Sequence, residues 1–506
     1  MLLKQPLLHV NDSLLNPRCS EEIALITAQS QRITYGRLRK DIATIAQLLG
    51  DRSLIFVIGD NDYIPILFYL SALEHSHVAL MLPKHLGARE LGRLIDLYQP
   101  RYLLLPPDAD LTLTNTNEAS WAFMRSYLNK LPIPLSSIFS SDANTGQEDY
   151  QLWLNSVPQA ELHPGLAMLL STSGSTGDPK LVRLTRGNLL SNAAAISEYL
   201  NLSPGERAVL HLPISYSFGL SVLNSHLYSG GSVLLTNQSL LSKGFWGVVR
   251  GHDVTSFAGV PYHYEILLKL RAEAMDFGSI KTMLLAGGAL NVNGLKKILA
   301  LCSTKGIKLF SMYGQTEASP RMSYLPPSVA EHKIGSIGVP VPGGRLWIKD
   351  VMGCEEGTVG AVGELIYEGP NVCLGYAYSA TDLSLGDNNN GILHTGDLAY
   401  RDSEGYVFLK GRLSRFLKIF GKRISLDQVE ILLGDRGFRA VALGDDSSLI
   451  VHVVDISEEG AKLIRKEIAE RCGVNISAVS VKPIQKIPRL KNGKVDYKCL
   501  SLQQTQ

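Results

Sequence analysis

The sequence predicts an α/β protein: a large N-terminal region of several subdomains, built on mostly parallel sheets, followed by a small, mobile α+β domain. The first observation is an alternation of periodicities. Apolar residues recur at helical spacing from Tyr35 to Leu49, and the continuous apolar run 54–58 follows them. The second is length, because 506 residues exceed the size at which one hydrophobic core stops growing. At least two structural domains are therefore expected.

The helix from Tyr35 is expected to end at Gly50, since glycine favours helix ends. Short apolar runs that read as buried strands recur along the chain, and helix-like stretches separate several of them. This arrangement favours a parallel sheet covered by helices. The expected strands are residues 54–58, 102–105, 167–170, 208–210, 232–235 and 282–285.

Two polar regions are predicted to be loops or insertions. Residues 107–165 are weakly periodic, apart from a helix-like pattern at 121–128, and are interpreted as a variable surface insertion. Residues 387–391, an aspartate and three asparagines before a glycine, are expected to form a turn, because Asn and Gly tolerate positive φ.

After Gly411 the sequence pattern changes to short basic and amphipathic segments, including residues 458–471. We therefore expect a large domain over residues 1–411 and a small C-terminal lid domain over residues 412–506.

Composition narrows the classes of function. Hydrophobic residues make up 45% of the chain and charged residues 19%, as in ordinary globular proteins rather than disordered or fibrous ones. With 49 Lys and Arg against 47 Asp and Glu, the formal charge is +2. That balance predicts neither nucleic-acid binding nor attraction to an anionic membrane.

The six cysteines are far apart and form no CxxC pair, so free thiols in a reducing compartment are expected. The first residues lack the apolar region of a secretory signal, and no apolar run approaches the ~20 residues that span a bilayer. The expected location is the cytoplasm, with no membrane span.

The most informative segment is STSGSTGDPK, residues 171–180, directly after an apolar run. Hydroxyls, glycine amides and a lysine on one loop can wrap a polyphosphate, because small residues let backbone N–H groups approach the anion. A Walker loop is excluded, since Lys180 follows Pro179 and precedes Leu181. The GxGxxG dinucleotide fingerprint is also absent from this segment. The remaining alternative is a Ser/Gly-rich linker.

This segment resembles the phosphate loop of the adenylate-forming superfamily, which includes acyl-CoA synthetases, nonribosomal-peptide adenylation domains and luciferases. Further motifs of that superfamily follow in the expected order. They are Tyr313-Gly314-Gln315-Thr316-Glu317, Thr395-Gly396-Asp397, Gly411-Arg412, Lys418 with Gly421, and Pro488-Arg489 with Gly493-Lys494-Val495-Asp496. Each motif is short, but together they cover the chain from about residue 30 to its end.

The resemblance implies activation of a carboxylate by attack on the α-phosphorus of ATP, so the site must hold two anions together. The phosphate loop would cradle the β- and γ-phosphates. Its nucleotide-binding residues are Thr172, Ser173, Gly174, Ser175, Thr176, Gly177 and Lys180.

The same resemblance assigns the rest of the nucleotide site. Tyr313 would stack on adenine, and Gly288 and Ala289 would lie against the base, unless they form only a strand-to-helix turn. Asp397 would accept hydrogen bonds from the ribose hydroxyls, supported by Arg412.

Four residues are expected to act in catalysis. Thr316 would contact the α-phosphate and Glu317 would hold Mg²⁺. Lys494 would bridge the attacking carboxylate and the α-phosphate, although it also lies in a basic segment that could be a solvated face. After adenylation the C-terminal domain would rotate and bring Lys418 towards the thiol's path.

Two positions depart from the superfamily pattern. The hinge position after the glycine-arginine pair is commonly Asp or Lys, and here it is Ser414. The phosphate-loop lysine is usually followed by glycine, and here Leu181 follows it, which should stiffen the end of the loop.

The resemblance also implies that the substrate pocket includes Tyr216 and Gly287, unless Tyr216 and Phe218 are only core aromatics. Members that activate amino acids place an aspartate near this point to pair with the substrate ammonium, but no Asp occurs between Pro213 and Ser232. A fatty, short-chain or aryl carboxylic acid is therefore favoured over an amino acid.

The expected function is an acyl-CoA ligase that uses ATP, Mg²⁺ and coenzyme A. A separate acyl carrier protein remains an alternative acceptor, because its phosphopantetheine presents the same thiol. An amino-acid adenylating enzyme and a non-catalytic nucleotide-binding protein are less favoured alternatives. Nothing in the sequence names the acid, the oligomeric state or the pathway.

Overall fold

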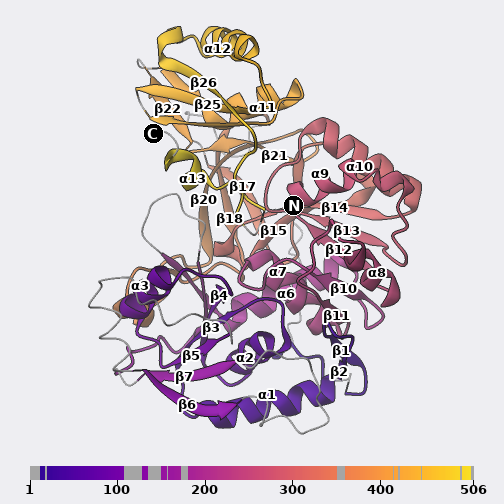
Figure 1. Cartoon of the computed structure of the whole chain (residues 1–506), viewed down its shortest axis with the longest axis vertical. Helices are drawn as coiled ribbons and strands as arrows, with labels where there is room; N and C mark the ends of the chain where they lie inside the picture. The colour runs from indigo at the N-terminus through magenta and orange to yellow at the C-terminus, as the bar shows by residue number, and fades with distance from the viewer. Residues whose placement is uncertain are drawn as a thin grey trace.

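The computed structural model describes residues 12–17, 20–106, 128–134, 150–155, 158–171, 180–349, 359–413, 415–419, 422–445, 447–490 and 493–502. Figure 1 shows two parts, a large α/β region and a smaller C-terminal unit stacked at one end of it. Among the described residues, no helix is both long enough and apolar enough to cross a bilayer.

The N-terminal sheet has eight strands among the described residues, in the order β19-β9-β8-β4-β3-β5-β7-β6. Its central strands β8, β4, β3 and β5 pair in parallel, and its outer strands are antiparallel. The strands are β3 (Leu54–Gly59), β4 (Val78–Pro83), β5 (Tyr102–Leu105), β6 (Leu128–Pro134), β7 (Gln151–Asn155), β8 (Leu166–Ser171), β9 (Leu181–Thr185) and β19 (Gly375–Ala377).

A second sheet has 13 strands among the described residues, in the order β17-β18-β20-β21-β16-β15-β14-β13-β12-β10-β11-β1-β2. It is parallel from β14 to β1 and antiparallel from β14 to β17. The strands are β1 (Ile23–Ile26), β2 (Arg32–Thr34), β10 (Arg207–Leu210), β11 (Ser232–Leu235), β12 (Ser256–Gly259), β13 (Thr282–Leu285), β14 (Lys308–Gly314), β15 (Arg321–Leu325), β16 (Ser336–Pro340), β17 (Arg345–Lys349), β18 (Gly363–Glu368), β20 (Ile392–Arg401) and β21 (Val407–Arg412).

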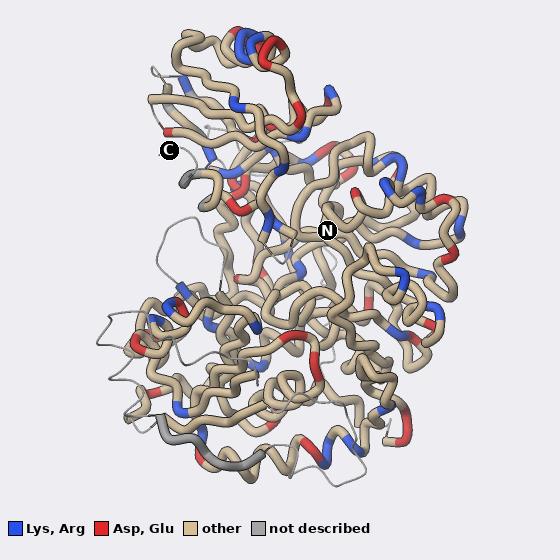
Figure 2. The backbone as a smooth tube through the Cα atoms, in the orientation of Figure 1, with Lys and Arg blue, Asp and Glu red and all other residues tan. Residues whose placement is uncertain are grey.

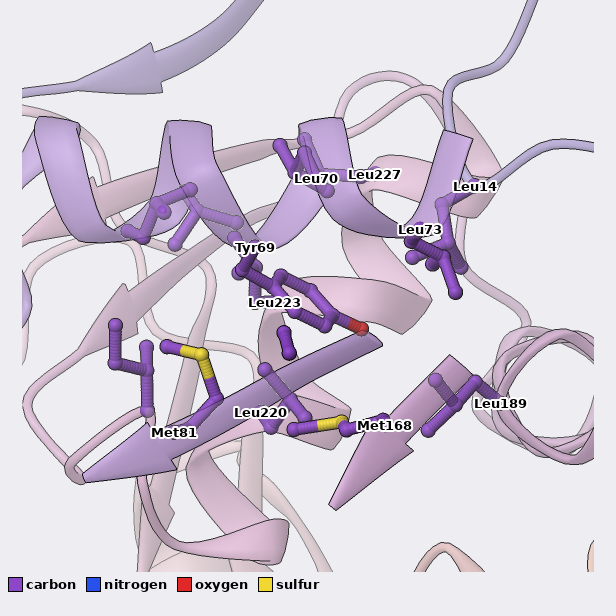
Figure 3. Close-up of a cluster of buried hydrophobic side chains, with 14 of the residues drawn as sticks. Leu14, Tyr69, Leu70, Leu73, Met81, Met168, Leu189, Leu220, Leu223 and Leu227 are labelled. Atoms are coloured by element: carbon purple, nitrogen blue, oxygen red, sulfur yellow. The ribbon is translucent and has the colours of Figure 1, made fainter. Parts of the chain in front are cut away.

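Helices fill the space between the two sheets and cover their outer faces. The helices between the sheets are α1 (Tyr35–Leu49), α2 (Tyr63–Glu74), α6 (Arg186–Leu200) and α7 (Ser217–Ser229), and their apolar side chains share one buried cluster with both sheets. Figure 3 shows Tyr69 of α2 close to Leu223 of α7, and Leu73 of α2 close to Leu14, in this cluster. The outer helices are α3 (Ala88–Tyr98) on the N-terminal sheet and α8 (Lys243–Gly251), α9 (Pro261–Lys269) and α10 (Val292–Lys305) on the second.

Local sequence explains this layering. In β3, Leu54, Phe56 and Ile58 pack towards α3, whereas Ile55 and Val57 pack towards the central helices, as the period of two in a strand requires. Because both faces are covered by helices, the strand reads as an unbroken apolar run. α1 begins where the side chain of Thr34 accepts a hydrogen bond from the N–H of Arg37, and it ends at Gly50, whose φ is +64°.

The expected parallel strands and the first helix are confirmed, and residues 387–391 lie outside helices and strands. The interpretation of residues 107–165 as a surface insertion is wrong in part, because β6 and β7 add two antiparallel strands to the sheet edge. Their alternation of polar and apolar residues is too weak to mark them as strands. Leu128, the last residue of the helix-like pattern at 121–128, begins β6, and residues 121–127 lie outside the described part.

The C-terminal unit has its own hydrophobic cluster, formed by buried residues between Leu417 and Val479. Its β24, β25 and β26 form a three-stranded sheet, beside the two-stranded ribbon of β22 and β23. The elements are β22 (Phe416–Ile419), β23 (Lys422–Ser425), α11 (Leu426–Asp435), β24 (Ala440–Asp445), β25 (Ser448–Val454), α12 (Glu458–Cys472), β26 (Val479–Ile484) and α13 (Tyr497–Leu502). Figure 2 shows Lys and Arg interspersed with Asp and Glu on α12 and on the outer helices. The division at residues 411 and 412 stays a prediction.

Candidate active site

The loop expected to bind phosphates closes a hairpin in the N-terminal sheet. Strands β8 and β9 are antiparallel, and Ser171 pairs with Leu181 at the end of the hairpin. The six predicted loop residues from Thr172 to Gly177 lie outside the described part of the chain. Lys180 is described and stands at the point where the loop enters β9.

Tyr376 connects Lys180 to Glu317. The Nζ atom of Lys180 lies 3.9 Å from the ring centre of Tyr376, and the Tyr376 hydroxyl donates a hydrogen bond of 2.7 Å to Oε1 of Glu317. Tyr376 lies on β19, which pairs with β9. One aromatic side chain therefore holds the lysine of the predicted phosphate loop near the predicted metal ligand.

The carboxyl end of β14 meets the start of α7. Thr316 is the first residue of a short 3-10 helix after β14, and its Oγ1 lies 3.2 Å from Oγ of Ser217, the first residue of α7. Tyr216 directly precedes α7. A Cβ atom added to Gly287 would lie 2.5 Å from the Tyr216 hydroxyl, so only glycine fits there. The two predicted pocket residues therefore touch, next to Thr316.

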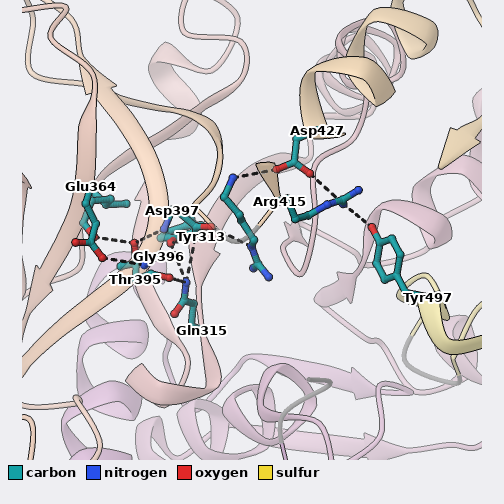
Figure 4. A network of polar contacts seen from close by, with 11 residues as sticks. Tyr313, Gln315, Glu364, Thr395, Gly396, Asp397, Arg415, Asp427 and Tyr497 are labelled. Carbon is teal, nitrogen blue, oxygen red and sulfur yellow. Dashed lines mark hydrogen bonds and ion pairs between the residues drawn. The ribbon is translucent and has the colours of Figure 1, made fainter. Parts of the chain in front are cut away.

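Asp397 of β20 is the centre of a hydrogen-bonded group that includes residues at the end of β14 and of β21. Its carboxylate accepts hydrogen bonds from the hydroxyl of Tyr313, from Nε2 of Gln315 at 3.0 Å and from Nε of Arg412 at 3.0 Å. Gln315 also donates to the carbonyl of Thr395 at 2.9 Å, as Figure 4 shows. Asp397 is buried and Arg412 is exposed, so the arginine covers the outer side of the carboxylate.

The segment that carries Lys494 docks against the start of α9. Arg489 donates a hydrogen bond of 2.9 Å to the carbonyl of Gly493, and its guanidinium lies 5.0 Å from the ring centre of Tyr262. Gly493 has φ of +80°, and a Cβ atom there would lie 2.6 Å from Cγ2 of Val260. The close approach of this turn to the large region therefore depends on glycine.

This docking places the Lys494 ammonium 5.2 Å from the ring centre of Tyr216. Burial lowers the pKa of Lys494 below its ordinary value, the positive charge of Arg412 lowers it further, and the negative charge of Glu317 opposes both. These electrostatic contributions place Lys494 among the predicted nucleotide-site residues.

A chain of polar contacts runs from Arg412 into the C-terminal unit. The backbone N–H of Arg412 donates to Asp427 at 3.0 Å, and Asp427 forms an ion pair of 3.0 Å with Arg415. Arg415 also pairs with Glu430 at 2.6 Å and donates to the hydroxyl of Tyr497 at 2.6 Å. In Figure 4 this chain runs from Asp397 to Tyr497, three residues beyond Lys494.

The fold brings most of the predicted residues together: Lys180, Tyr216, Gly287, Tyr313, Thr316, Glu317, Asp397, Arg412 and Lys494 lie in linked contacts. Gly288 and Ala289 are exposed beside them, and Gly288 faces Pro261 of α9. Lys418 is on β22 in the C-terminal unit, and its side chain lies outside the described part, as do Ser414 and Gly421.

Sequence reasoning missed Tyr376, Gln315 and Arg415. Tyr376 lies in no recognised motif, and only the pairing of β19 with β9 brings it to the site. Gln315 occupies the variable position of the motif around Tyr313 and Glu317. Because a side-chain amide can donate to a carboxylate, its bond to Asp397 could have been predicted. Arg415 follows the predicted hinge, and its partners lie 12 or more residues away.

The arrangement suits a substrate with dispersed negative charge. Lys180, Arg412 and Lys494 bring three cations around Glu317 and Asp397. Within the described part of the chain, no group of three or more His, Cys, Asp and Glu residues could hold a metal ion. A metal bound at Glu317 would share its oxygen ligands with phosphate and water, which is how Mg²⁺ is usually held.

Comparisons with known proteins identify the family and its relatives. Residues 16–377 match the model of the AMP-binding enzyme family. A 2-succinylbenzoate–CoA ligase of Bacillus thuringiensis subsp. konkukian is 27% identical over 422 residues, 81% of this chain and 79% of its own length. A probable CoA ligase of Humulus lupulus is 25% identical over 502 residues, 95% of this chain and 93% of its own length. In structure, the o-succinylbenzoate CoA synthetase of Bacillus subtilis, solved with its acyl-adenylate intermediate, has a TM-score of 0.71 at 22% identity, with 95% of each chain covered.

Proposed function

The chain belongs to the AMP-binding enzyme family, and on that premise we propose that it converts a carboxylic acid and ATP to an acyl-adenylate and then to a coenzyme A thioester. It is an AMP-forming acid–thiol ligase. The curated relatives named as CoA ligases, which span most of the chain, support coenzyme A as the acceptor. A separate carrier protein with a phosphopantetheine thiol is the second candidate acceptor.

In the first step, a carboxylate oxygen of the acid forms a bond to the α-phosphorus of ATP, and the bond from that phosphorus to the pyrophosphate oxygen breaks. Both reactants are anionic, so the step needs cations and oriented donors that cancel their repulsion. We assign the pyrophosphate side to Lys180 and the phosphate loop. Thr316 and Lys494 would act at the α-phosphate and the attacking carboxylate.

The nucleoside would lie on the Asp397 side of the site. The Asp397 carboxylate already accepts hydrogen bonds from Tyr313, Gln315 and Arg412, so it is held in one orientation. Two ribose hydroxyls can replace or add to these donors. Gly288 and Ala289 are exposed, and Gly288 lies beside Pro261. Their small side chains leave room for the adenine.

Glu317 fits a Mg²⁺ ion that is shared with phosphates. One of its oxygens accepts the hydrogen bond from Tyr376, which fixes the carboxylate. When bound, the ion would neutralise charge on the phosphate oxygens.

In the second step, the thiol sulfur attacks the acyl carbon, AMP leaves with the electron pair of the broken acyl–oxygen bond, and the thiol proton goes to solvent or a base. For this step we propose that the C-terminal unit, residues 412–506, turns as a lid and withdraws Lys494. Its ribbon with Lys418 would then face the thiol.

The observation that carries this proposal is the position of Lys494. A lysine of the C-terminal unit lies over Tyr216, whose neighbour Ser217 contacts Thr316, and the charges of Glu317 and Arg412 act on its pKa. A cation supplied by a different unit can be brought to the site for adenylation and withdrawn for the second step.

The test uses the full chain with ATP, Mg²⁺ and a panel of fatty, aryl, dicarboxylic and amino acids, with hydroxylamine to trap the acyl-adenylate. We expect hydroxamate from at least one acid class, and thioester and AMP when coenzyme A is then added. Silence across the panel, with ATP binding intact, would favour a non-catalytic nucleotide-binding protein. Hydroxamate without transfer to coenzyme A would favour the carrier protein.

A further inference from the structure

Arg321, the first residue of β15, is a buried cation with neutral partners. Its side chain is 1% exposed. Its Nη atoms donate to the Tyr199 hydroxyl at 3.0 Å, to Oγ of Ser221 at 3.1 Å and to the sulfur of Met312 at 2.6 Å. Its Nε atom is buried without a hydrogen-bond partner. Among the described residues, no ion pair includes Arg321.

Such an environment is unfavourable for a guanidinium unless another acceptor completes it. A buried charge needs strong acceptors, and an unpaired N–H in the interior loses its hydration without replacement. The other fully buried arginine of the described part of the chain provides the contrast. Arg183 is 0% exposed, and it donates to the carbonyls of Leu374 and Gly386 and to the side-chain oxygen of Asn388. Every guanidinium nitrogen of Arg183 donates a hydrogen bond, whereas Nε of Arg321 has no acceptor.

The position of Arg321 relates it to the proposed reaction centre. Ser217 and Ser221 are four residues apart on α7, so they lie on one face of the helix, about one turn (~5.4 Å) apart. Ser217 contacts Thr316 at 3.2 Å, and Ser221 contacts Arg321 at 3.1 Å. One turn of α7 therefore separates the residue assigned to the α-phosphate from the buried cation.

Aromatic rings give a second route between the same two points. The ammonium of Lys494 lies over Tyr216, whose ring meets the ring of Phe218 edge-on at 6.2 Å between centres. The Arg321 guanidinium lies 4.4 Å from the centre of the Phe218 ring. The pocket residue Tyr216 and its neighbour Phe218 thus lie between a cation at the reaction centre and a second cation beyond it.

We propose that Arg321 ends the acyl pocket and that the acid activated here is a dicarboxylate, with its second carboxylate bound by this guanidinium. The inference rests on the function proposed above. A carboxylate can take two N–H groups of one guanidinium, which gives a charge-assisted contact of defined geometry. The second carboxylate would lie about one helical turn from the carboxyl that is adenylated, which suits a short chain or a single ring between them.

The experiment compares acids that differ only at the far end: adipate with hexanoate, and pimelate with heptanoate. ATP–pyrophosphate exchange is measured for the wild-type chain, Arg321→Met and Arg321→Lys, with Lys308→Met as control. Lys308 is an exposed cation on the neighbouring strand β14. We expect the wild type and the control to favour the dicarboxylates by at least about tenfold in kcat/KM, mainly through KM.

Arg321→Met is expected to lose this preference while it keeps its kcat with the monocarboxylates, and Arg321→Lys to keep part of the preference. Equal or better use of the monocarboxylates by the wild type would overturn the inference and leave the proposed function standing. The inference is also overturned if Arg321→Met, shown to be folded by circular dichroism, keeps the preference. If Arg321→Met does not fold, the wild-type panel and Arg321→Lys decide. If no acid of any class supports ATP–pyrophosphate exchange, the proposed function is overturned as well.

Discussion

The Nζ atom of Lys494 lies 5.2 Å from the ring centre of Tyr216, although 278 positions separate the two residues in the sequence. Tyr216 precedes α7 in the large region, and Lys494 belongs to the C-terminal unit. In this structure the C-terminal unit is therefore oriented so that Lys494 lies at the candidate active site.

Lys494→Ala is expected to reduce the rate of adenylation by about 10²–10³-fold, because it removes the cation that we propose acts where charge develops. ATP binding and the fold should be largely unchanged. Hydroxamate formation and a nucleotide-binding titration measure the two effects. The control is Lys486→Ala, an exposed lysine of the same basic segment. Equal activity of Lys494→Ala and the wild type would remove Lys494 from the mechanism.

The lowered pKa of Lys494 predicts an alkaline loss of adenylation. The protonated ammonium is the active form, so kcat/KM should fall as the pH rises through a pKa below the ordinary value of 10.5. Burial is the main cause of the lowering. In Lys494→Arg the side chain stays protonated throughout, so this limb should disappear even if the rate is lower. A pH profile of pyrophosphate release checks it, and an identical limb in the arginine variant would contradict the assignment.

Gly493→Ala is expected to displace the Lys494 segment from α9. The added methyl group would lie 2.6 Å from Cγ2 of Val260, in a backbone conformation with φ of +80°. Adenylation should fall at least about tenfold, whereas thioester formation from a supplied acyl-adenylate should change little, because in the proposed mechanism the unit has turned away for that step.

The control for this variant is Gly437→Ala. Gly437 has φ of +85° in the same unit, with no atom within 4 Å of an added Cβ, so the substitution adds backbone strain of about 1–2 kcal/mol without a clash. If both variants reduce the two half-reactions equally, the docking contact of Gly493 has no special role.

Arg415→Ala is expected to destabilise the C-terminal unit by about 3 kcal/mol, because it leaves Asp427 and Glu430, both mostly buried, without their cation. It also removes the hydrogen bond to Tyr497, three residues after Lys494, so adenylation should fall too. Urea unfolding followed by circular dichroism measures the stability. Arg439→Ala, which breaks an exposed pair with Asp455, should cost less than about 1 kcal/mol. Similar losses in the two variants would refute the structural role of Arg415.

Much of the fold was predictable because its signals are local. The period of two in β3 and the helical period of α1 are properties of short segments, and burial on both faces makes the parallel strands visibly apolar. The edge strands β6 and β7 escaped because their apolar positions are few, and their place depends on pairing with β5. Sheet order and the antiparallel end of the second sheet likewise depend on pairing between distant segments.

The sequence by itself determined which side chains could take part in the chemistry: the loop with Lys180, the pair Thr316 and Glu317, the aspartate Asp397 and the lysine Lys494. Only the tertiary structure decided how they are held, through Tyr376 between Lys180 and Glu317 and through Gln315 on Asp397. It also decided that Arg321 is buried without a carboxylate among the described residues. The physical reason is that residue type and spacing set local conformation and chemical capacity, whereas burial and partner choice arise only when distant segments pack together.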